Sequence, residues 1–343
     1  MSSLAPALAG CAGTAGEAPR TDGPGRAALL VPLEGRAAEL GQIMALAASL
    51  GGGTPGFDPE IAVIDTGGTP ESAAAAAVRA REGGARIVLG PLFGDQARAV
   101  ADAASNLPVV TFSNDAKLAA RDLFVFGVTP DQSAQAALGF AAGRGMGRIG
   151  LVVPEGPFGT RTEAAVREVA KVLGLALLAP LTAPEPAAAV ARMQAAAGGL
   201  PDAVYLPAAN ASLAPLAGAF RAAGVQVLGS AQWLGVDAAG TPALEGAWFA
   251  APDPSRYGPF TEAFSARSEA SPGLIAGLAF DAAEAARILG RIGQQNRAGL
   301  LRDRGFDGVL GPFRFLEDGR VARGLAVLGV EAGALKLLGA TGV

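Results

Sequence analysis

The chain has 343 residues, a formal net charge of −4 and 50% apolar residues. This length and apolar content predict a two-domain α/β protein, and the scattered basic residues argue against nucleic-acid binding. The sequence contains no histidine, which excludes a Ser-His-Asp triad and removes the commonest metal ligand.

The first part of the chain alternates short β-branched runs with helical patterns. The runs are too short for helices, whereas the segments between them repeat apolar residues with helical spacing. Thr69 and Thr129 are each followed by proline, which is typical of a helix N-cap. The predicted strands are 27–33, 61–65, 87–89, 109–112 and 123–128, and the helices between them end near residues 50, 82 and 106.

A second round of alternation begins at Thr129, and the pattern changes again after Trp248. From there the sequence predicts consecutive helices, followed by short strands around the hairpin-type turn Glu317-Asp318-Gly319. The predicted strands of the second round are 148–153, 175–178, 203–206 and 226–228, and its helices are 160–173, 187–197 and 212–223. The later helices are 257–268, 275–292 and 297–302, and the stranded tail is 311–338.

Because each half contains its own βα repeat, we predict two doubly wound parallel-sheet lobes rather than one barrel. The late helices should return to the first lobe and the tail to the second, which requires three crossings. We expect these crossings near residues 127–130, 250–254 and 307–312. The predicted organisation is a tether at 1–26, lobe 1 at 27–128 plus 252–306, and lobe 2 at 129–251 plus 307–343.

Two loops at the carboxyl ends of neighbouring strands are the first binding-site candidates. They run from Gly90 to Gly94 and from Ser113 to Asp115. In open α/β sheets ligands bind at this edge, where backbone N–H groups at helix starts carry partial positive charge. The alternative explanation is local structure: helix or turn capping for Ser113 and Asn114, and tight-turn geometry for the glycines.

The only cysteine, Cys11, lies in the run Leu8-Ala9-Gly10-Cys11. Small residues before the cysteine, after an apolar stretch, resemble the lipobox of bacterial lipoproteins, in which the cysteine is lipidated. Residues 13–25 would then be a flexible tether, and Ala12 favours the outer membrane. The alternative is an ordinary flexible N-terminus. The lipobox predicts a periplasmic protein that contacts the membrane only through its lipid.

Seven short motifs, in order along the chain, resemble the type I periplasmic binding proteins of the leucine-binding group, which include penicillin-binding protein activators. This resemblance covers residues 27–343 and implies two lobes, three crossings and a small ligand held between the lobes without catalysis. The motifs are Leu30-Val31-Pro32-Leu33-Glu34-Gly35, Asp65-Thr66-Gly67-Gly68-Thr69-Pro70, Gly90-Pro91-Leu92-Phe93, Pro108-Val109-Val110-Thr111-Phe112-Ser113, Phe126-Gly127-Val128-Thr129-Pro130, Tyr205-Leu206-Pro207-Ala208 and Gly229-Ser230-Ala231-Gln232-Trp233.

The resemblance also implies ligand contacts from both lobes and no cofactor or metal. A ligand carboxylate would be held by the loop at Gly90 and by the Ser113 hydroxyl, Phe158 would cover the ligand, and Trp233 would face it from a strand end. Either aromatic residue could instead belong to the core. The candidate contacts are Leu33, Gly90, Pro91, Leu92, Phe93, Gly94, Phe112, Ser113, Asn114, Glu155, Phe158, Ala208, Asn210, Gln232 and Trp233.

Amino-acid binders of this family need a carboxylate in the second lobe for the ligand ammonium, because a buried unpaired charge is costly. This chain has Ala231 and Gln232 there, with Glu155 and Asp237 only nearby. This departure disfavours a free amino acid and is closer to the activator group.

Three functions follow from the sequence, in order of preference. The first is a lipoprotein receptor for an amino-acid-like or amide ligand, working with an ABC permease. The second is an activator that contacts a penicillin-binding protein. The remote third is an enzyme that uses carboxylates such as Asp65, Glu155 or Asp281, because acid–base catalysis would have to run without histidine.

Overall fold

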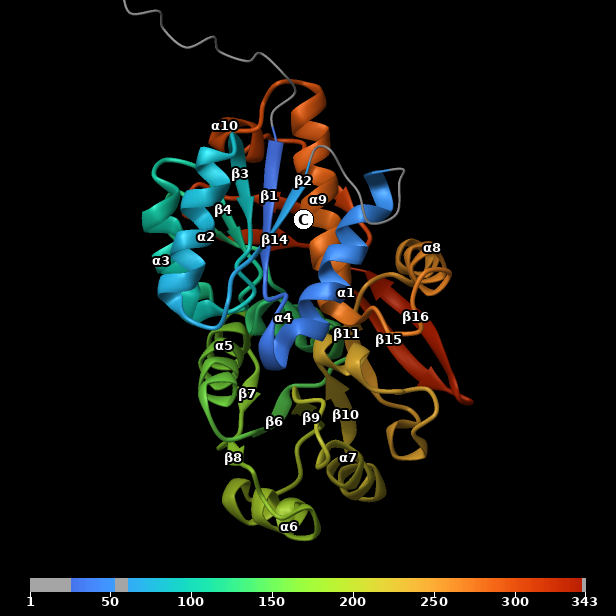
Figure 1. Ribbon diagram of the computed structural model, residues 1–343. Helices are drawn as coiled ribbons and strands as arrows, with labels where there is room; N and C mark the ends of the chain where they lie inside the picture. Colours follow the sequence, from blue (N-terminus) through green and yellow to red (C-terminus); the bar gives the residue numbers. More distant parts are fainter. Residues whose placement is uncertain (1–25, 53–60, 341–343) are drawn as a thin grey trace, which may run out of the picture.

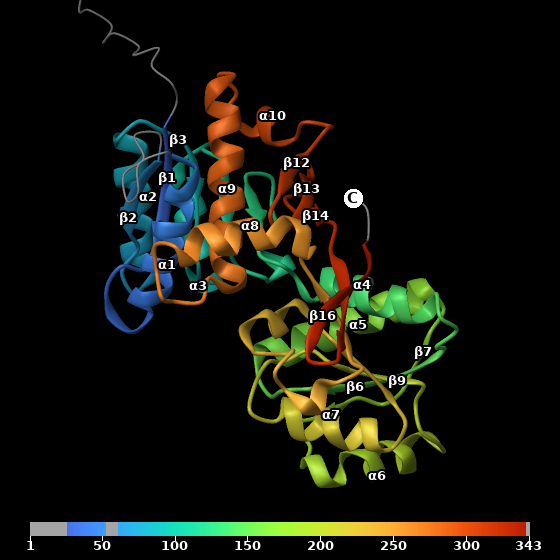
Figure 2. The ribbon, with the colours of Figure 1, turned by 90° about the vertical axis from the view of Figure 1, so that its right-hand side faces the viewer.

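The computed structural model describes residues 26–52 and 61–340. Figures 1 and 2 show two α/β lobes, one above the other, which confirms the predicted fold class. Cys11 and the predicted tether lie outside the described residues. Within the described part of the chain, no helix is long and apolar enough to cross a membrane.

Lobe 1 is built on a parallel five-stranded sheet with the strand order β2-β1-β3-β4-β5. Its strands are β1 (Arg26–Val31), β2 (Ile61–Asp65), β3 (Ala85–Leu89), β4 (Val109–Thr111) and β5 (Leu123–Val125). Leu29 and Leu30 on β1 are both fully buried but belong to different apolar clusters, because successive side chains point to opposite faces. Both faces of the sheet must therefore be covered.

Helices cover the two faces of the lobe 1 sheet. One face packs against α2 and α3, and the other packs against α1 and α9 (Figure 1). These helices are α1 (Ala38–Ser49), α2 (Pro70–Glu82), α3 (Gly94–Ala104) and α9 (Gly273–Arg291). The predicted N-cap of α2 is confirmed, because the Thr69 hydroxyl accepts the Ser72 N–H and Pro70 begins the helix.

Lobe 2 repeats the same strand order and then extends it. Five parallel strands run β7-β6-β9-β10-β11, and β15 and β16 add an antiparallel hairpin beside β11. The strands are β6 (Arg148–Val153), β7 (Ala176–Leu177), β8 (Leu181–Thr182), β9 (Ala203–Leu206), β10 (Gln226–Gly229), β11 (Trp248–Ala251), β15 (Ala326–Glu331) and β16 (Ala334–Ala340). The short β8 also pairs with β6, and the sequence analysis did not predict it.

Helices again cover both faces of the lobe 2 sheet. The α4–α5 pair packs on one face and the α6–α7 pair on the other. These helices are α4 (Pro130–Ala142), α5 (Pro157–Leu173), α6 (Pro186–Ala197) and α7 (Leu213–Ala222). After β11 the chain returns to lobe 1 through α8 (Pro254–Ser265), α9 and α10 (Arg297–Leu300), as the run of helices predicted.

The tail departs from the predicted domain boundary. A small antiparallel sheet forms from β12 (Phe306–Gly308), β13 (Gly311–Phe315) and β14 (Val321–Arg323). Its rings Phe313 and Phe315 pack on Phe124 and Phe126 of lobe 1, with ring centroids 4.9 to 5.7 Å apart. Figure 2 shows this sheet beside α9 and α10. The predicted start of lobe 2 at residue 307 is therefore too early, and the chain enters the lobe 2 sheet only at β15.

A fully buried ion pair joins this small sheet to lobe 1. The guanidinium of Arg323 lies 3.3 Å from the carboxylate of Asp281 on α9, and neither side chain is exposed. Asp281 also accepts the N–H groups of Val309 and Leu310. Arg323 donates to the Phe126 carbonyl, directly before the first crossing between the lobes. The pair therefore connects α9, the small sheet and two of the crossings.

Removing one member of this pair should strongly destabilise the protein. We expect Arg323→Met to lower the free energy of unfolding by about 3–5 kcal/mol, because the Asp281 carboxylate stays buried without its cation. Chemical denaturation measures this change. The control is Arg320→Met in the same hairpin, whose ion pair with Asp318 is exposed and should contribute less than about 1 kcal/mol. Equal effects of the two substitutions would contradict the stabilising role of the buried pair between Asp281 and Arg323.

Candidate functional site

The main cavity lies between the lobes, at the carboxyl-terminal edges of the parallel strands of lobe 1. Its volume is about 710 Å³, which is in the range of small-molecule sites. Most of the lining comes from lobe 1, and lobe 2 contributes three residues. The lining residues are Leu40, Ile43, Leu92, Phe93, Gly94, Asp95, Phe112, Ser113, Asn114, Asp115, Gly127, Val128, Arg161, Gln232, Gly235, Ser271, Pro272, Gly273, Leu274, Ile275 and Leu278.

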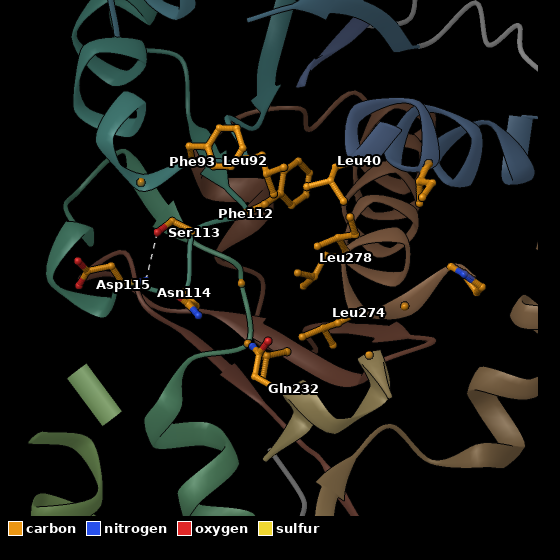
Figure 3. A pocket seen from close by; sticks show the side chains of 18 of the residues that line it. Leu40, Leu92, Phe93, Phe112, Ser113, Asn114, Asp115, Gln232, Leu274 and Leu278 are labelled. Carbon is orange, nitrogen blue, oxygen red and sulfur yellow. Dashed lines mark hydrogen bonds between the residues drawn. The ribbon is translucent and has the colours of Figure 1, made fainter. Parts of the chain in front are cut away.

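One wall of this cavity is apolar. Leu40 of α1 and Leu278 of α9 approach Phe112, which directly follows β4, and Leu274 continues the wall towards lobe 2 (Figure 3). Leu40 is 39% exposed, which is unusual for a large apolar side chain facing inward on a helix. This wall can remove the apolar body of a ligand from water.

The opposite side of the cavity is formed by the two predicted loops, of which the Gly90–Gly94 loop brings Leu92 and Phe93 and the Ser113–Asp115 loop is polar. Ser113 is buried, and its Oγ accepts the Asp115 N–H at 3.2 Å (Figure 3). A Cβ on Gly94 would lie 2.8 Å from this Oγ, so only glycine allows the start of α3 to approach so closely. The capping role of Ser113 is therefore present, and its hydroxyl also borders the cavity at a helix N-terminus.

Arg161 of α5 brings a cation to the cavity from lobe 2. Its guanidinium lies 3.4 Å from the Asn114 Oδ1 and 3.7 Å from the Asp115 carboxylate, so it links the two lobes across the cleft. Its Nε is buried and has no hydrogen-bond partner among the described residues. The sequence analysis did not select Arg161. The sequence feature that could have indicated Arg161 is its place as a basic residue in the second turn of a helix that follows a strand.

Seven of the predicted contacts line the main cavity. They are Leu92, Phe93, Gly94, Phe112, Ser113, Asn114 and Gln232. Three other lobe 1 candidates lie outside the lining and have structural partners. Leu33 donates its N–H to Asp65, Gly90 packs closely on the backbone of Leu30, and the Pro91 carbonyl accepts the Thr111 hydroxyl.

The lobe 2 candidates other than Gln232 and Trp233 are divided between two places. Glu155, Ala208 and Asn210 surround a separate cavity of about 210 Å³ at the edge of β6 and β9. Phe158 borders a much smaller recess next to the main cavity. Glu155 therefore does not supply the main cavity with the carboxylate that an ammonium group would need.

Trp233 is a core residue, which corrects its selection as a ligand contact. Its side chain has no exposed surface and packs 5.5 Å from the Phe249 ring. The indole N–H donates to the Leu206 carbonyl at 2.9 Å. A Cβ on Gly229 would lie 2.4 Å from the indole, so the glycine of this motif makes room for the tryptophan. Trp233 was selected because tryptophan is rare in this chain and this one follows a strand end. These two features do not distinguish a tryptophan in the core from one in the cleft.

The carboxylates considered for catalysis have separate surroundings. Asp65 accepts the Leu33 N–H, Asp281 pairs with Arg323, and Glu155 lies at the second cavity. The residues described by the structure contain no group of three or more Asp, Glu or Cys side chains that could hold a metal ion. The polar side chains that line the main cavity are two hydroxyls, two amides, two carboxylates and one guanidinium, from Ser113, Ser271, Asn114, Gln232, Asp95, Asp115 and Arg161.

Comparison with protein families identifies the chain. Residues 25–334 match the model described as periplasmic binding protein, and the chain belongs to this family. Membership implies a periplasmic or other extracytoplasmic location. The comparison with curated proteins gave no match.

Solved structures share the fold at low identity. A putative branched-chain amino acid ABC transporter protein from Rhodospirillum rubrum is 22% identical, with a TM-score of 0.77 over 92% of this chain and 100% of that one. A solute binding protein from R. palustris, in complex with benzoate, is 19% identical, with a TM-score of 0.66 over 93% and 96%. LpoA from Haemophilus influenzae is 16% identical, with a TM-score of 0.68 over 94% and 60%. These likenesses confirm the resemblance predicted from the motifs.

The correction for Trp233 is testable with its neighbour as a matched control. We expect Trp233→Ala to lower the free energy of unfolding by about 3–5 kcal/mol, because it opens a large hole in the lobe 2 core. Gln232→Ala, at the half-buried cavity surface, should change it by no more than about 0.5 kcal/mol. Chemical denaturation of both variants gives the comparison. A small effect at Trp233 would mean that its side chain is not a core element.

Proposed function

We propose that the chain is a cell-envelope solute receptor that binds a small molecule between its two lobes. The observation that supports this most directly is the cavity of about 710 Å³, with an apolar wall on one side and a few polar groups on the other. The family assignment supports the same class. In such a receptor the ligand would be passed to an ABC permease, and the protein itself would do no chemistry.

The cavity favours a small monocarboxylate with an apolar body, aliphatic or aromatic. The Arg161 Nε–H, the Ser113 hydroxyl and the N-terminus of α3 are suitable donors for a carboxylate. The carboxylates of the lining, Asp95 and Asp115, both come from lobe 1, as do Ser113 and α3, and the three lobe 2 residues include none for a ligand ammonium. A zwitterionic amino acid would therefore lose the hydration of its ammonium without a lobe 2 partner. The benzoate complex of the R. palustris protein is consistent with this chemistry.

A ligand panel with an Arg161 variant tests this proposal. Benzoate, isovalerate and leucine are compared with benzamide and methyl benzoate by calorimetry. We expect a free carboxylate without an ammonium to bind with micromolar affinity, and its neutral derivative to bind at least about tenfold more weakly. Arg161→Met should abolish this difference because it removes the cation.

The control for this test is Arg167→Met. Arg167 lies on the same helix α5, but its side chain is 59% exposed and paired with Glu163. This variant should keep the wild-type preference for the carboxylate. Equal binding of acids and neutral derivatives by the wild type would contradict the role of Arg161, and a panel without any binding would contradict the receptor function.

A penicillin-binding protein activator is the second candidate, and the LpoA likeness is the observation that favours it. LpoA is the longer chain, since this protein spans 60% of it. An activator would act through protein contacts and would not require a ligand. A panel without binding, together with direct binding of a purified penicillin-binding protein, would favour this function over the receptor.

A lipid anchor at Cys11 would fit either function. We expect the full chain, expressed in a Gram-negative cell, to sediment with membranes, and Cys11→Ser to move it to the soluble fraction. Ser3→Ala is the control, because it leaves the cysteine in place. Fractionation with an antibody measures the distribution. Soluble wild-type protein would contradict lipidation.

A further inference from the structure

A second feature of the cleft is a small recess in lobe 2, which we call the hydroxyl recess. Thr129, Thr162 and Tyr205 line it, and its volume of about 10 Å³ is close to that of one water-sized oxygen. Val128 and Gln232 line both this recess and the main cavity, so the two spaces adjoin. The recess is therefore placed at the lobe 2 side of the proposed ligand site.

Two hydroxyl groups of the recess have no hydrogen-bond partner among the described residues, the Oγ1 of Thr162 and the phenolic oxygen of Tyr205. The third, on Thr129, belongs to the capping box at the start of α4. Thr162 and Tyr205 have no exposed surface at all, and Thr129 is 5% exposed. A buried hydroxyl without a partner is destabilising, and native proteins rarely retain one without a reason. Two such hydroxyls around one small space point to a shared partner.

The two serine hydroxyls of the recess already have partners. The Ser230 hydroxyl donates to the Pro207 carbonyl at 2.5 Å, and the Ser133 hydroxyl accepts the Ala231 N–H at 3.4 Å. Burial raises the pKa of Tyr205, so its phenol stays neutral at every physiological pH. The recess has no charged side chain in its lining. This small, uncharged lining suits one neutral oxygen that can both donate and accept hydrogen bonds.

We propose that the hydroxyl recess is an oxygen-binding subsite of the cleft, filled by one neutral oxygen. That oxygen is the hydroxyl group of a bound ligand, or a water molecule in its place. This inference rests on the proposed receptor function and extends it, because it selects hydroxylated ligands among small carboxylates. A ligand hydroxyl and a water molecule offer the same hydrogen bonds, and the crystal structures described below distinguish them.

Thermal unfolding without any ligand is the first test. Tyr205→Phe and Thr162→Val each remove one hydroxyl with almost no change in shape. If the recess holds an oxygen, each variant loses a hydrogen bond, and the melting temperature should fall by about 2–4 °C. Tyr257→Phe calibrates the scale, because the Tyr257 hydroxyl donates to the Gly273 carbonyl at 2.8 Å. An unchanged or raised melting temperature for both recess variants would overturn the proposal, because removing an unpaired hydroxyl from a dry core stabilises a protein.

Crystal structures of the full chain, alone and with 4-hydroxybenzoate, identify the source of the oxygen. We expect an oxygen within hydrogen-bond distance of both Tyr205 and Thr162 in each crystal, from water in the first and from water or the ligand phenol in the second. Two structures without such an oxygen would overturn the subsite. A water in the recess of a protein that binds no ligand would leave the subsite intact and remove only the receptor function.

Discussion

The buried ion pair between Asp281 and Arg323 is the interaction on which the arrangement of the lobes depends. Two charges without solvent contact persist because they face each other and because two backbone N–H groups and a carbonyl add further hydrogen bonds. The elements that they join are distant in sequence. They hold the small sheet on lobe 1, beside segments that pass from one lobe to the other.

The cleft itself follows from the repeated strand order in the two lobes. In each lobe the helices cover both faces of a parallel sheet, and only the strand ends remain for binding. In lobe 1 these ends carry the start of α3 and the Ser113 loop, beside the apolar side chains of α1 and α9. The division into an apolar wall and a polar wall is therefore a consequence of topology and does not require a dedicated motif.

Lobe 2 contributes less surface to the cavity but decides its chemistry. Arg161 brings to the cavity a cation whose Nε–H has no hydrogen-bond partner among the described residues. The hydroxyl recess adds a neutral polar site, which shares Gln232 with the main cavity. The carboxylate Glu155, which would suit an ammonium group, opens into a different cavity. In the proposed function, this pattern of charge and hydrogen bonding favours a carboxylate ligand over a free amino acid.

The sequence by itself determined the two βα repeats, most helix starts and the two lobe 1 loops of the site, because these depend on local periodicity and capping. Only the tertiary structure decided that Trp233 lies in the core and that Arg161 reaches Asn114 across the cleft. It also decided that β12–β14 stays with lobe 1, since its phenylalanine rings pack on Phe124 and Phe126. These outcomes depend on contacts between residues far apart in the chain, which no local pattern records.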